Sequence, residues 1–542
     1  MQGHFIDFIF LILIILALVM FANKLRIAYP IVLVLGGLLL SFTSAFSEVA
    51  IDPELVFFIF LPPLLYEAAW QTSWKQFWKF RRVITSFAFP IVIITSCVIA
   101  FVSQAFIPGF TLALGFLLGG IISPPDAISA TTIMRQVTVP KSMVSIIEGE
   151  SLLNDASSLV IVRFATAAIV TSQFHLQEAS INFVLVIIMG TLIGLLTALI
   201  FYAIHRWLPT TTGIEIILTL VAPYCMYYFA EHFEFSGVLA VVSGGLFLSS
   251  KRQSMLNYRS RIEAVNVWTS LVFVMNGIVF LMIGLQLPII TKQLGSVSVA
   301  SAIGYGLGIS LVLVVARMLC TFGAVVFTKF MSRFITVADA NPGWKGPLIL
   351  GWAGMRGVVS LAAALAIPLT LPGGEAFPHR NLILFITFIV ILVTLVFQGL
   401  TLPWLIRKIN PVDKKAIPEQ KQELIIQKKL AQLSHQYLQE KYGEQRDSNA
   451  HLDNLLSRFE LDLNLYYKML DDTDGEQGAS LRNHQGVYLE LLDEQRSLLE
   501  KMNQKAEFED ELIRKYLSLI DIEEYKVRER QLIGEIKTND PQ

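Results

Sequence analysis

The feature that most constrains this chain is a series of apolar stretches, each close to the length of a membrane-spanning helix. Such a helix needs roughly 20 mainly apolar residues. Thirteen stretches within residues 1–410 meet or approach that length, so the sequence predicts an all-α polytopic membrane protein with 13 transmembrane helices. The predicted spans are residues 4–22, 28–46, 52–69, 83–106, 111–134, 142–171, 180–205, 214–230, 235–249, 266–287, 297–328, 346–371 and 381–406.

Basic residues are distributed unevenly between the loops that join these spans. If the N-terminus lies outside, the inner loops contain 18 Lys and Arg residues and the outer loops contain two, Lys292 and Arg380. Basic residues are enriched in the cytoplasmic loops of membrane proteins. The pattern therefore predicts a multi-pass protein of the cell membrane, with its N-terminus outside and its C-terminus in the cytoplasm.

The last part of the chain differs from the rest in charge and in pattern. Residues 1–410 contain 23 Lys and Arg against 16 Asp and Glu, a net charge of +7, whereas residues 411–542 contain 19 against 27, a net charge of −8. Pairs of Leu and Ile recur in this second part about every seven residues, which is typical of amphipathic helices. We expect a transmembrane domain over residues 1–410 and a helical cytoplasmic tail over residues 411–542 that serves regulation or dimerisation.

Three basic residues lie inside the predicted spans, and five of the acidic residues there join them as candidates for a polar interior. Each would cost about 2.5–3.5 kcal/mol or more at the centre of a helix that faces lipid. We therefore expect them to face a polar interior, and a purely structural network of ion pairs is the alternative explanation for the set. The eight residues are Glu67, Asp126, Glu148, Glu150, Asp155, Arg163, Arg317 and Arg356.

Two of the spans are broken by their own sequence. The fifth contains Pro124 and Pro125, which lack amide donors and clash with the preceding helical turn. The twelfth contains three glycines around Arg356, which favour irregular backbone. The two spans are seven apart in order and so run in opposite directions. This is the pattern of inverted repeats with broken helices and an ion site near the middle of the membrane.

The sixth span contains the densest group of polar residues. Asp155 lies about halfway along it, and Ser151 is one turn away on the same helix face, with Glu148 a further turn along. A carboxylate and a hydroxyl near unwound backbone form an all-oxygen site for a hard cation. Because the same carboxylate can bind a proton instead, competition between the two ions at Asp155 would suffice for antiport.

Four short motifs on these spans resemble the monovalent cation:proton antiporter-1 family, which includes the NhaP-like and the eukaryotic NHE-like Na⁺/H⁺ exchangers. The resemblance covers residues 1–410. The motifs are Leu-Pro-Pro-Leu-Leu-Tyr-Glu at residues 61–67, Ser-Pro-Pro-Asp at 123–126, Glu-Ser-Leu-Leu-Asn-Asp at 150–155 and Arg-Gly at 356–357.

The resemblance implies roles for the residues of the predicted site. Asp155 would bind the transported cation or the proton, and Ser151 and Asp126 would complete the Na⁺ site. Asn154 would occupy the place where electrogenic relatives carry a second Asp, which implies electroneutral exchange. In the fifth span the chain departs from many relatives, because Asp126 follows two prolines and precedes Ala127.

The remaining charged residues are predicted to support this site. The resemblance implies a structural ion pair between Glu150 and Arg356, and a place for Glu67 near the access path. We expect Glu148 to support the same path and Arg317 to be the structural partner of a core carboxylate. Arg163 receives no predicted role.

The sequence therefore predicts a secondary transporter, not an enzyme, that exchanges Na⁺, or Li⁺, for H⁺ by alternating access and serves pH homeostasis. The alternatives are a K⁺/H⁺ antiporter and an ion channel, although no repeated filter motif supports a channel. The prediction includes no cofactor besides the transported Na⁺ and H⁺. The expected partners are membrane lipid, a second copy of the chain in a homodimer and a regulatory partner of the tail, with no nucleic acid.

Overall fold

The structure of the protein is a computed structural model. It describes residues 2–43, 56–171, 176–292, 294, 297–334, 343–371, 374–411, 419–443, 446, 449–471, 476–503 and 510–535. Within these residues every named element is helical, and the only bridge of β type joins Thr370 to Ala376. The chain divides into two compact units, Met1–Val412 and Asp413–Gln542.

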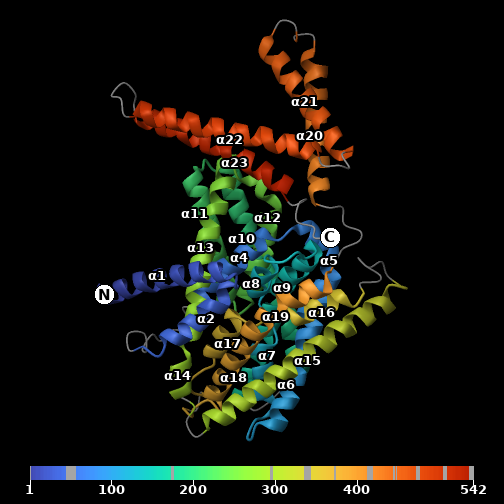
Figure 1. Ribbon diagram of the computed structural model, residues 1–542. Coiled ribbons are helices and arrows are strands. Elements are labelled where there is room, and N and C mark those ends of the chain that lie inside the picture. The colour runs from blue at the N-terminus through green and yellow to red at the C-terminus, as the bar shows by residue number, and fades with distance from the viewer. Residues whose placement is uncertain are drawn as a thin grey trace. The chain divides into compact units, whose positions relative to one another are not determined.

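The first unit is a bundle of α-helices with π-helical segments between some of them (Figure 1). In chain order its elements are α1 (Gln2–Leu25), α2 (Tyr29–Leu40), η1 (Val56–Phe60), α4 (Leu61–Gln71), α5 (Trp74–Ser86), η2 (Phe87–Ile91), α6 (Val92–Phe106), α7 (Leu112–Ile122), α8 (Ala127–Met134), α9 (Lys141–Thr171), α10 (Leu176–Trp207), α11 (Thr212–His232), α12 (Gly237–Met255), α13 (Tyr258–Leu285), α14 (Leu287–Lys292), α15 (Val299–Met331), α16 (Lys345–Trp352), α17 (Val358–Leu365), α18 (Arg380–Val393), η3 (Thr394–Gln398) and α19 (Gly399–Ile409).

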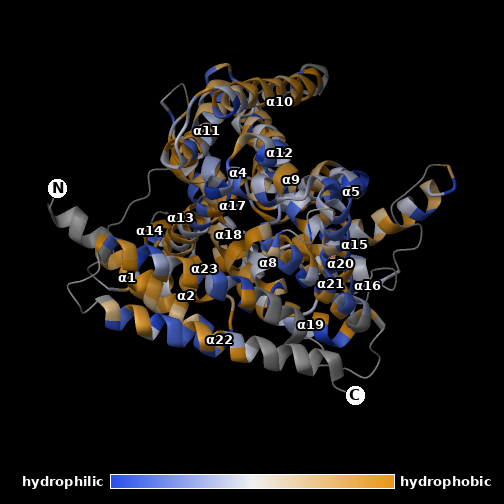
Figure 2. Cartoon of the chain, turned by 90° about the horizontal axis from the view of Figure 1, so that it is seen from above, coloured by the Kyte–Doolittle hydropathy of each residue, from blue (hydrophilic) through white to orange (hydrophobic). Residues whose placement is uncertain are grey.

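Apolar helices of membrane-spanning length dominate this unit. Among the described residues, eight helical segments are long and apolar enough to cross a membrane, and two shorter apolar helices, Ile9–Leu25 and Tyr29–Leu40, accompany them. Figure 2 shows α10 as predominantly hydrophobic, and its side chains Ile181, Ile188 and Leu196 are exposed, as expected for a face in contact with lipid. The all-α membrane fold is confirmed, and the number of thirteen spans stays a prediction.

Both predicted helix breaks are present. Residues 123–126 are non-helical between α7 and α8, and residues 353–357 are non-helical between α16 and α17. The first break contains the two prolines, which supply no amide donors to a helix. At the second break a Cβ atom on Gly357 would overlap the carboxylate of Asp126, so only glycine allows the two segments to approach this closely.

The two breaks contact each other through the backbone. The amide nitrogen of Asp126 donates a hydrogen bond to the carbonyl oxygen of Met355 over 2.7 Å. Lipid offers no hydrogen-bond partners, so non-helical backbone at membrane depth has to be satisfied by protein. The first break therefore supplies a hydrogen-bond donor and the second an acceptor, so each satisfies a backbone group of the other.

Helix α9 packs into two separate apolar cores. Its residues Ile146 and Ile147 belong to a core formed largely by α1, α2, α6–α8 and α15–α19. Its residues Leu152 and Ala156 belong to a second core formed by α4 and α10–α13. The segment between residues 146 and 156 therefore lies at the boundary of the two cores, and Asp155 is on it.

The described residues of the second unit form four amphipathic helices, α20 (Glu419–Tyr442), α21 (Ala450–Asp471), α22 (Glu476–Asn503) and α23 (Asp510–Glu535). Helix α20 packs against α21, and α22 packs against α23. Leu492 of α22 and Ile513 of α23 are buried in the second pair. Arg496 of α22 also forms ion pairs with Asp521 and Glu524 of α23, at 2.8 and 2.6 Å. The tail is helical, as predicted, and its regulatory or dimerising role stays a prediction.

The close approach of α7 to α6 gives a test of the packing beside the first break. A Cβ atom on Gly119 would lie 2.6 Å from the carbonyl oxygen and 2.9 Å from the Cα of Ser96, and backbone atoms cannot move aside cheaply. Gly119→Ala is therefore expected to destabilise the protein by about 1–3 kcal/mol, the usual cost of overpacking. The measurement is the thermal unfolding midpoint of the purified protein in detergent.

Gly304 in α15 is the matched control, because a Cβ atom there would meet nothing within 4 Å. Gly304→Ala should leave the midpoint unchanged or raise it slightly, since alanine favours helix over glycine. Equal midpoints for the two variants would show that α6 and α7 are not in close backbone contact at Gly119.

Candidate ion-binding site

Asp155 is a buried carboxylate without a partner. It lies near the middle of the 31-residue helix α9 and is 5% exposed. It makes no hydrogen bond or ion pair with any residue in the described part of the chain. Burying an ionised carboxylate without compensation is very costly. Its environment therefore suits this side chain only when a proton or a cation neutralises it.

Two neighbours on α9 place oxygen atoms near Asp155. The Nδ2 of Asn154 donates to the carbonyl oxygen of Pro125 over 3.1 Å, whereas its buried Oδ1 has no hydrogen-bond partner among the described residues. The Oγ of Ser151 accepts a hydrogen bond from the amide of Ala127, the first residue of α8, over 3.3 Å. The structure thus brings Ser151 and Asn154 together with the first break.

Asp126 is held as the N-terminal cap of α8. Its Oδ1 accepts from the amide of Ile128 over 3.0 Å, and its Oδ2 accepts from the amide and the hydroxyl of Ser129 over 3.4 and 2.6 Å. A carboxylate has about four acceptor positions, so one position on Oδ1 is left for an ion. Asp126 also lies close enough to act electrostatically on Asp155. The sequence did not predict its capping role.

Arg356 satisfies the carbonyl groups that the breaks leave without donors. This fully buried guanidinium donates from Nε to Ile122 over 2.8 Å, from Nη2 to Ser123 over 3.2 Å and from Nη1 to Gly354. The predicted ion pair between Glu150 and Arg356 is therefore wrong. The physical reason is that unwound backbone within the membrane needs donors, and Arg356 supplies them.

Glu150 pairs with Arg317 of α15 instead. The two side chains form a bidentate ion pair with N–O distances of 2.8 and 2.9 Å, and both are almost fully buried. A Cβ atom on Gly354 would overlap the Arg317 side chain, so the glycine gives it room. The prediction that Arg317 is the partner of a core carboxylate is confirmed, and the structure identifies that carboxylate as Glu150.

Glu67 and Glu148 are half-buried and belong to a polar group near the part of α9 that comes before Asp155 in the sequence. Both lie within electrostatic range of Arg135, and Glu67 lies within range of Glu148. The side chain of Gln71 donates a hydrogen bond to Glu67. The structure thus brings the two predicted access-path residues together, and their role stays a prediction.

Arg163, which received no predicted role, contacts α11 and the turn after it. Its guanidinium pairs with Glu231 and donates to the carbonyl oxygen of Glu234 over 3.3 Å. Both side chains line a cavity of about 1250 Å³, which Leu159 also lines, one helical turn beyond Asp155. No local sequence signal could have indicated this pair, because 68 positions separate its members.

The Glu150–Arg317 pair gives a testable prediction. Glu150→Gln and Arg317→Met are each expected to cost about 3–5 kcal/mol of stability, because the remaining charge stays buried without a partner. The double variant should lose less than the sum of the single losses, since the pair acts as one unit. Thermal unfolding in detergent measures all three.

The control is the pair formed by Arg259 and Glu263, which lie one turn apart on the exposed surface of α13 at 2.7 Å. Removing either member is expected to cost about 0.3–0.5 kcal/mol. Additive losses at Glu150 and Arg317 would contradict the buried pair.

Comparison with known proteins agrees with this fold. The family model described as "Sodium/hydrogen exchanger, transmembrane" matches residues 9–408. The sodium, potassium, lithium and rubidium/H⁺ antiporter of Bacillus pumilus is 32% identical over 414 residues, which are 73% of this chain and 61% of that protein. The uncharacterized Na⁺/H⁺ exchanger YjcE of Escherichia coli is 32% identical over 447 residues, which are 80% of this chain and 81% of that protein.

A solved structure shares the fold. The sodium proton antiporter MjNhaP1 of Methanocaldococcus jannaschii matches with a TM-score of 0.57 at 18% identity, over 74% of this chain and 97% of that one. Together with the family match over residues 9–408, this confirms the resemblance found in the sequence. The chain belongs to the sodium/hydrogen exchanger family, whose members are secondary transporters that exchange ions across membranes and are not enzymes.

Proposed function

We propose that this protein exchanges Na⁺ for H⁺ across the membrane, with both ions competing for Asp155. The observation that carries this proposal is a buried carboxylate without a partner among the described residues, in the middle of α9, whose neighbours Ser151 and Asn154 contact the first of two helix breaks that touch each other. A single site that holds either ion, but not both, couples their opposite movements. Competition thus accounts for antiport without a second transport site.

Side-chain oxygen atoms are the first candidates to hold Na⁺. The carbonyl oxygens of Ile122, Ser123 and Gly354 each already accept a hydrogen bond from Arg356, and that of Pro125 accepts one from Asn154. Within the described chain the Asp155 carboxylate and the Oδ1 of Asn154 are uncommitted, and Ser151 and Asp126 keep further acceptor positions. An all-oxygen set of this kind suits a hard monovalent cation.

K⁺/H⁺ exchange is the second candidate function. The Bacillus pumilus relative is named as an antiporter of sodium, potassium, lithium and rubidium, and K⁺ would use oxygen ligands of the same kind as Na⁺. Proton flux in vesicles, driven in turn by a Na⁺ and by a K⁺ gradient, separates the two functions. Flux with K⁺ and none with Na⁺ would replace the proposal by this second candidate.

Access to Asp155 would alternate between two approaches along α9. Glu148 lies seven residues before Asp155 and Leu159 lies four residues after it, about 10 and 6 Å along the helix. Glu148 belongs to the polar group with Glu67, and Leu159 lines the cavity of about 1250 Å³. The basic inner loops support a cytoplasmic position for the approach past Glu148 and an outer position for the approach through the cavity.

The location and assembly of the protein extend this proposal. Basic residues in the predicted inner loops support a cell-membrane protein with its N-terminus outside and its tail in the cytoplasm. A homodimer, a regulatory partner of the tail and a role in pH homeostasis complete the proposed function. Cross-linking in native membranes tests the dimer, and labelling of single introduced cysteines from either side tests the orientation.

Asp155→Asn is expected to abolish exchange while the protein stays folded, because an amide takes up no proton and carries no negative charge to neutralise Na⁺. The assay is Na⁺-driven proton flux in sealed proteoliposomes at several pH values. Glu263→Gln, which removes an exposed carboxylate on α13, is the control and should keep full exchange. If a folded Asp155→Asn protein still exchanged ions in a manner that depends on pH, Asp155 would be excluded as the ion carrier.

The transport cycle is expected to move no net charge. Asn154 cannot titrate, so one carboxylate would neutralise one Na⁺ in one direction and one H⁺ in the other. A membrane potential acts with about 2.3 kcal/mol per charge per 100 mV on a charged step and hardly at all on a neutral one. Exchange should therefore be unaffected by a potential set with valinomycin and K⁺, once K⁺ has been excluded as a substrate.

Asn154→Asp is the companion variant, because a second carboxylate that titrates in the working pH range should introduce voltage dependence. A strong response of the unaltered protein to the potential would contradict one-for-one exchange. Asp126, whose Oδ1 keeps one free acceptor position, would then be the leading candidate for a second proton carrier.

A further inference from the structure

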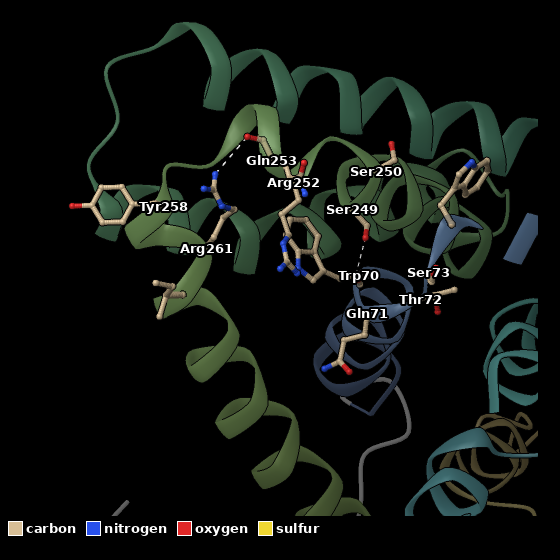
Figure 3. A pocket seen from close by; sticks show the side chains of 12 residues that line it. Trp70, Gln71, Thr72, Ser73, Ser249, Ser250, Arg252, Gln253, Tyr258 and Arg261 are labelled. Atoms are coloured by element: carbon tan, nitrogen blue, oxygen red, sulfur yellow. Dashed lines mark hydrogen bonds between the residues drawn. The ribbon is translucent and has the colours of Figure 1, made fainter. Parts of the chain in front are cut away.

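A second cavity of about 890 Å³ lies away from Asp155, where α4 ends, α5 begins and the turn from α12 to α13 passes (Figure 3). Its lining includes two arginines, Arg252 and Arg261, five side chains with a hydroxyl group and no carboxylate. The cavity is therefore cationic, and the loops around it are among those predicted to lie on the cytoplasmic side.

The two arginines differ in how they are held. The Nη1 of Arg261 donates to the carbonyl oxygens of Leu256 and Gln253, over 2.6 and 3.4 Å, which fixes this guanidinium and leaves its Nε and Nη2 uncommitted within the described chain. Arg252 is half-buried and makes no side-chain hydrogen bond or ion pair with any described residue. Two guanidinium groups thus face one cavity with most of their donors free, which is the arrangement that binds phosphate.

Aromatic and apolar side chains border the cationic part. Trp74 is 48% and Tyr258 is 74% exposed, and both residue types concentrate where membrane meets water. On α13, Ile262 lines the cavity and Val265 follows three residues later, and both are exposed. The cationic lining therefore adjoins an exposed apolar surface at Ile262 and Val265, which suits a ligand with a charged head and a hydrocarbon tail.

We propose that this cavity binds the phosphate head group of an anionic phospholipid, with Arg252 and Arg261 as its ligands and the exposed apolar residues of α13 beside its acyl chain. Basic pockets between membrane helices bind such head groups on the cytoplasmic side of membranes. A soluble phosphate compound shares the head-group chemistry but would gain nothing from Ile262 and Val265. The lipid is therefore the favoured source of the phosphate.

The test compares three forms of the full-length protein in detergent: the unaltered chain, Arg252→Gln and Arg259→Gln. Arg259 is the matched control because it lies near the cavity on α13 and carries the same charge, but does not line the cavity. Phosphatidylglycerol should raise the thermal midpoint of the unaltered protein and of Arg259→Gln by the same amount, because a ligand that binds the folded state stabilises it. The shift should fall by half or more in Arg252→Gln, and phosphatidylcholine should produce no such difference between the variants.

Native mass spectrometry gives a second readout that does not depend on stability. Arg252→Gln should retain fewer bound phosphatidylglycerol molecules than Arg259→Gln under the same conditions. Equal lipid retention and equal thermal shifts in these two variants would overturn the proposal.

Inorganic phosphate and glycerol 3-phosphate form the soluble arm of the experiment. They are expected to stabilise the protein far less than phosphatidylglycerol does, because they lack the acyl chains. If the soluble anions stabilised the protein as much as the lipid does, and Arg252→Gln lost this effect, the cavity would still be a phosphate site. Its ligand would then be a soluble phosphate compound and not a lipid.

Discussion

The two broken helices depend on one side chain, the guanidinium of Arg356. A break within a membrane leaves carbonyl groups without donors, and lipid supplies none. Arg356 donates to Ile122 and Ser123 on one break and to Gly354 on the other. Because one planar group satisfies both breaks, the two segments can meet in the interior of the bundle, where the start of α8 reaches α9 through Ser151.

This arrangement separates the polar groups that hold the fold from those that are free to hold an ion. The carbonyl oxygens at the breaks are bonded by Arg356 and Asn154, Asp126 caps α8, and Glu150 is neutralised by Arg317. The Asp155 carboxylate stays uncommitted within the described chain. A proton or cation that binds at Asp155, as proposed, would leave the bonds between Arg356 and the breaks in place.

The sequence predicted features that depend on local chemistry and missed those that depend on which way a side chain points. The prolines of the fifth span and the glycines of the twelfth predicted both breaks, because each acts on its own backbone. The partner of Glu150 could not be predicted in the same way. Arg317 and Arg356 are both long, buried and distant in sequence from Glu150, and only packing decides that Arg317 reaches the carboxylate.

The ion pairs of α9 indicate which neighbours it would move with during transport. Glu150 binds Arg317 of α15 in a fully buried pair, and separating such a pair costs about 3–5 kcal/mol. Arg163 binds Glu231 of α11 in a pair whose arginine side chain is 47% exposed, and exposed pairs contribute about 0–1 kcal/mol. In the proposed cycle, breaking the second pair in each turnover would cost far less than breaking the first. We therefore expect α9 to stay with α15 more firmly than with α11.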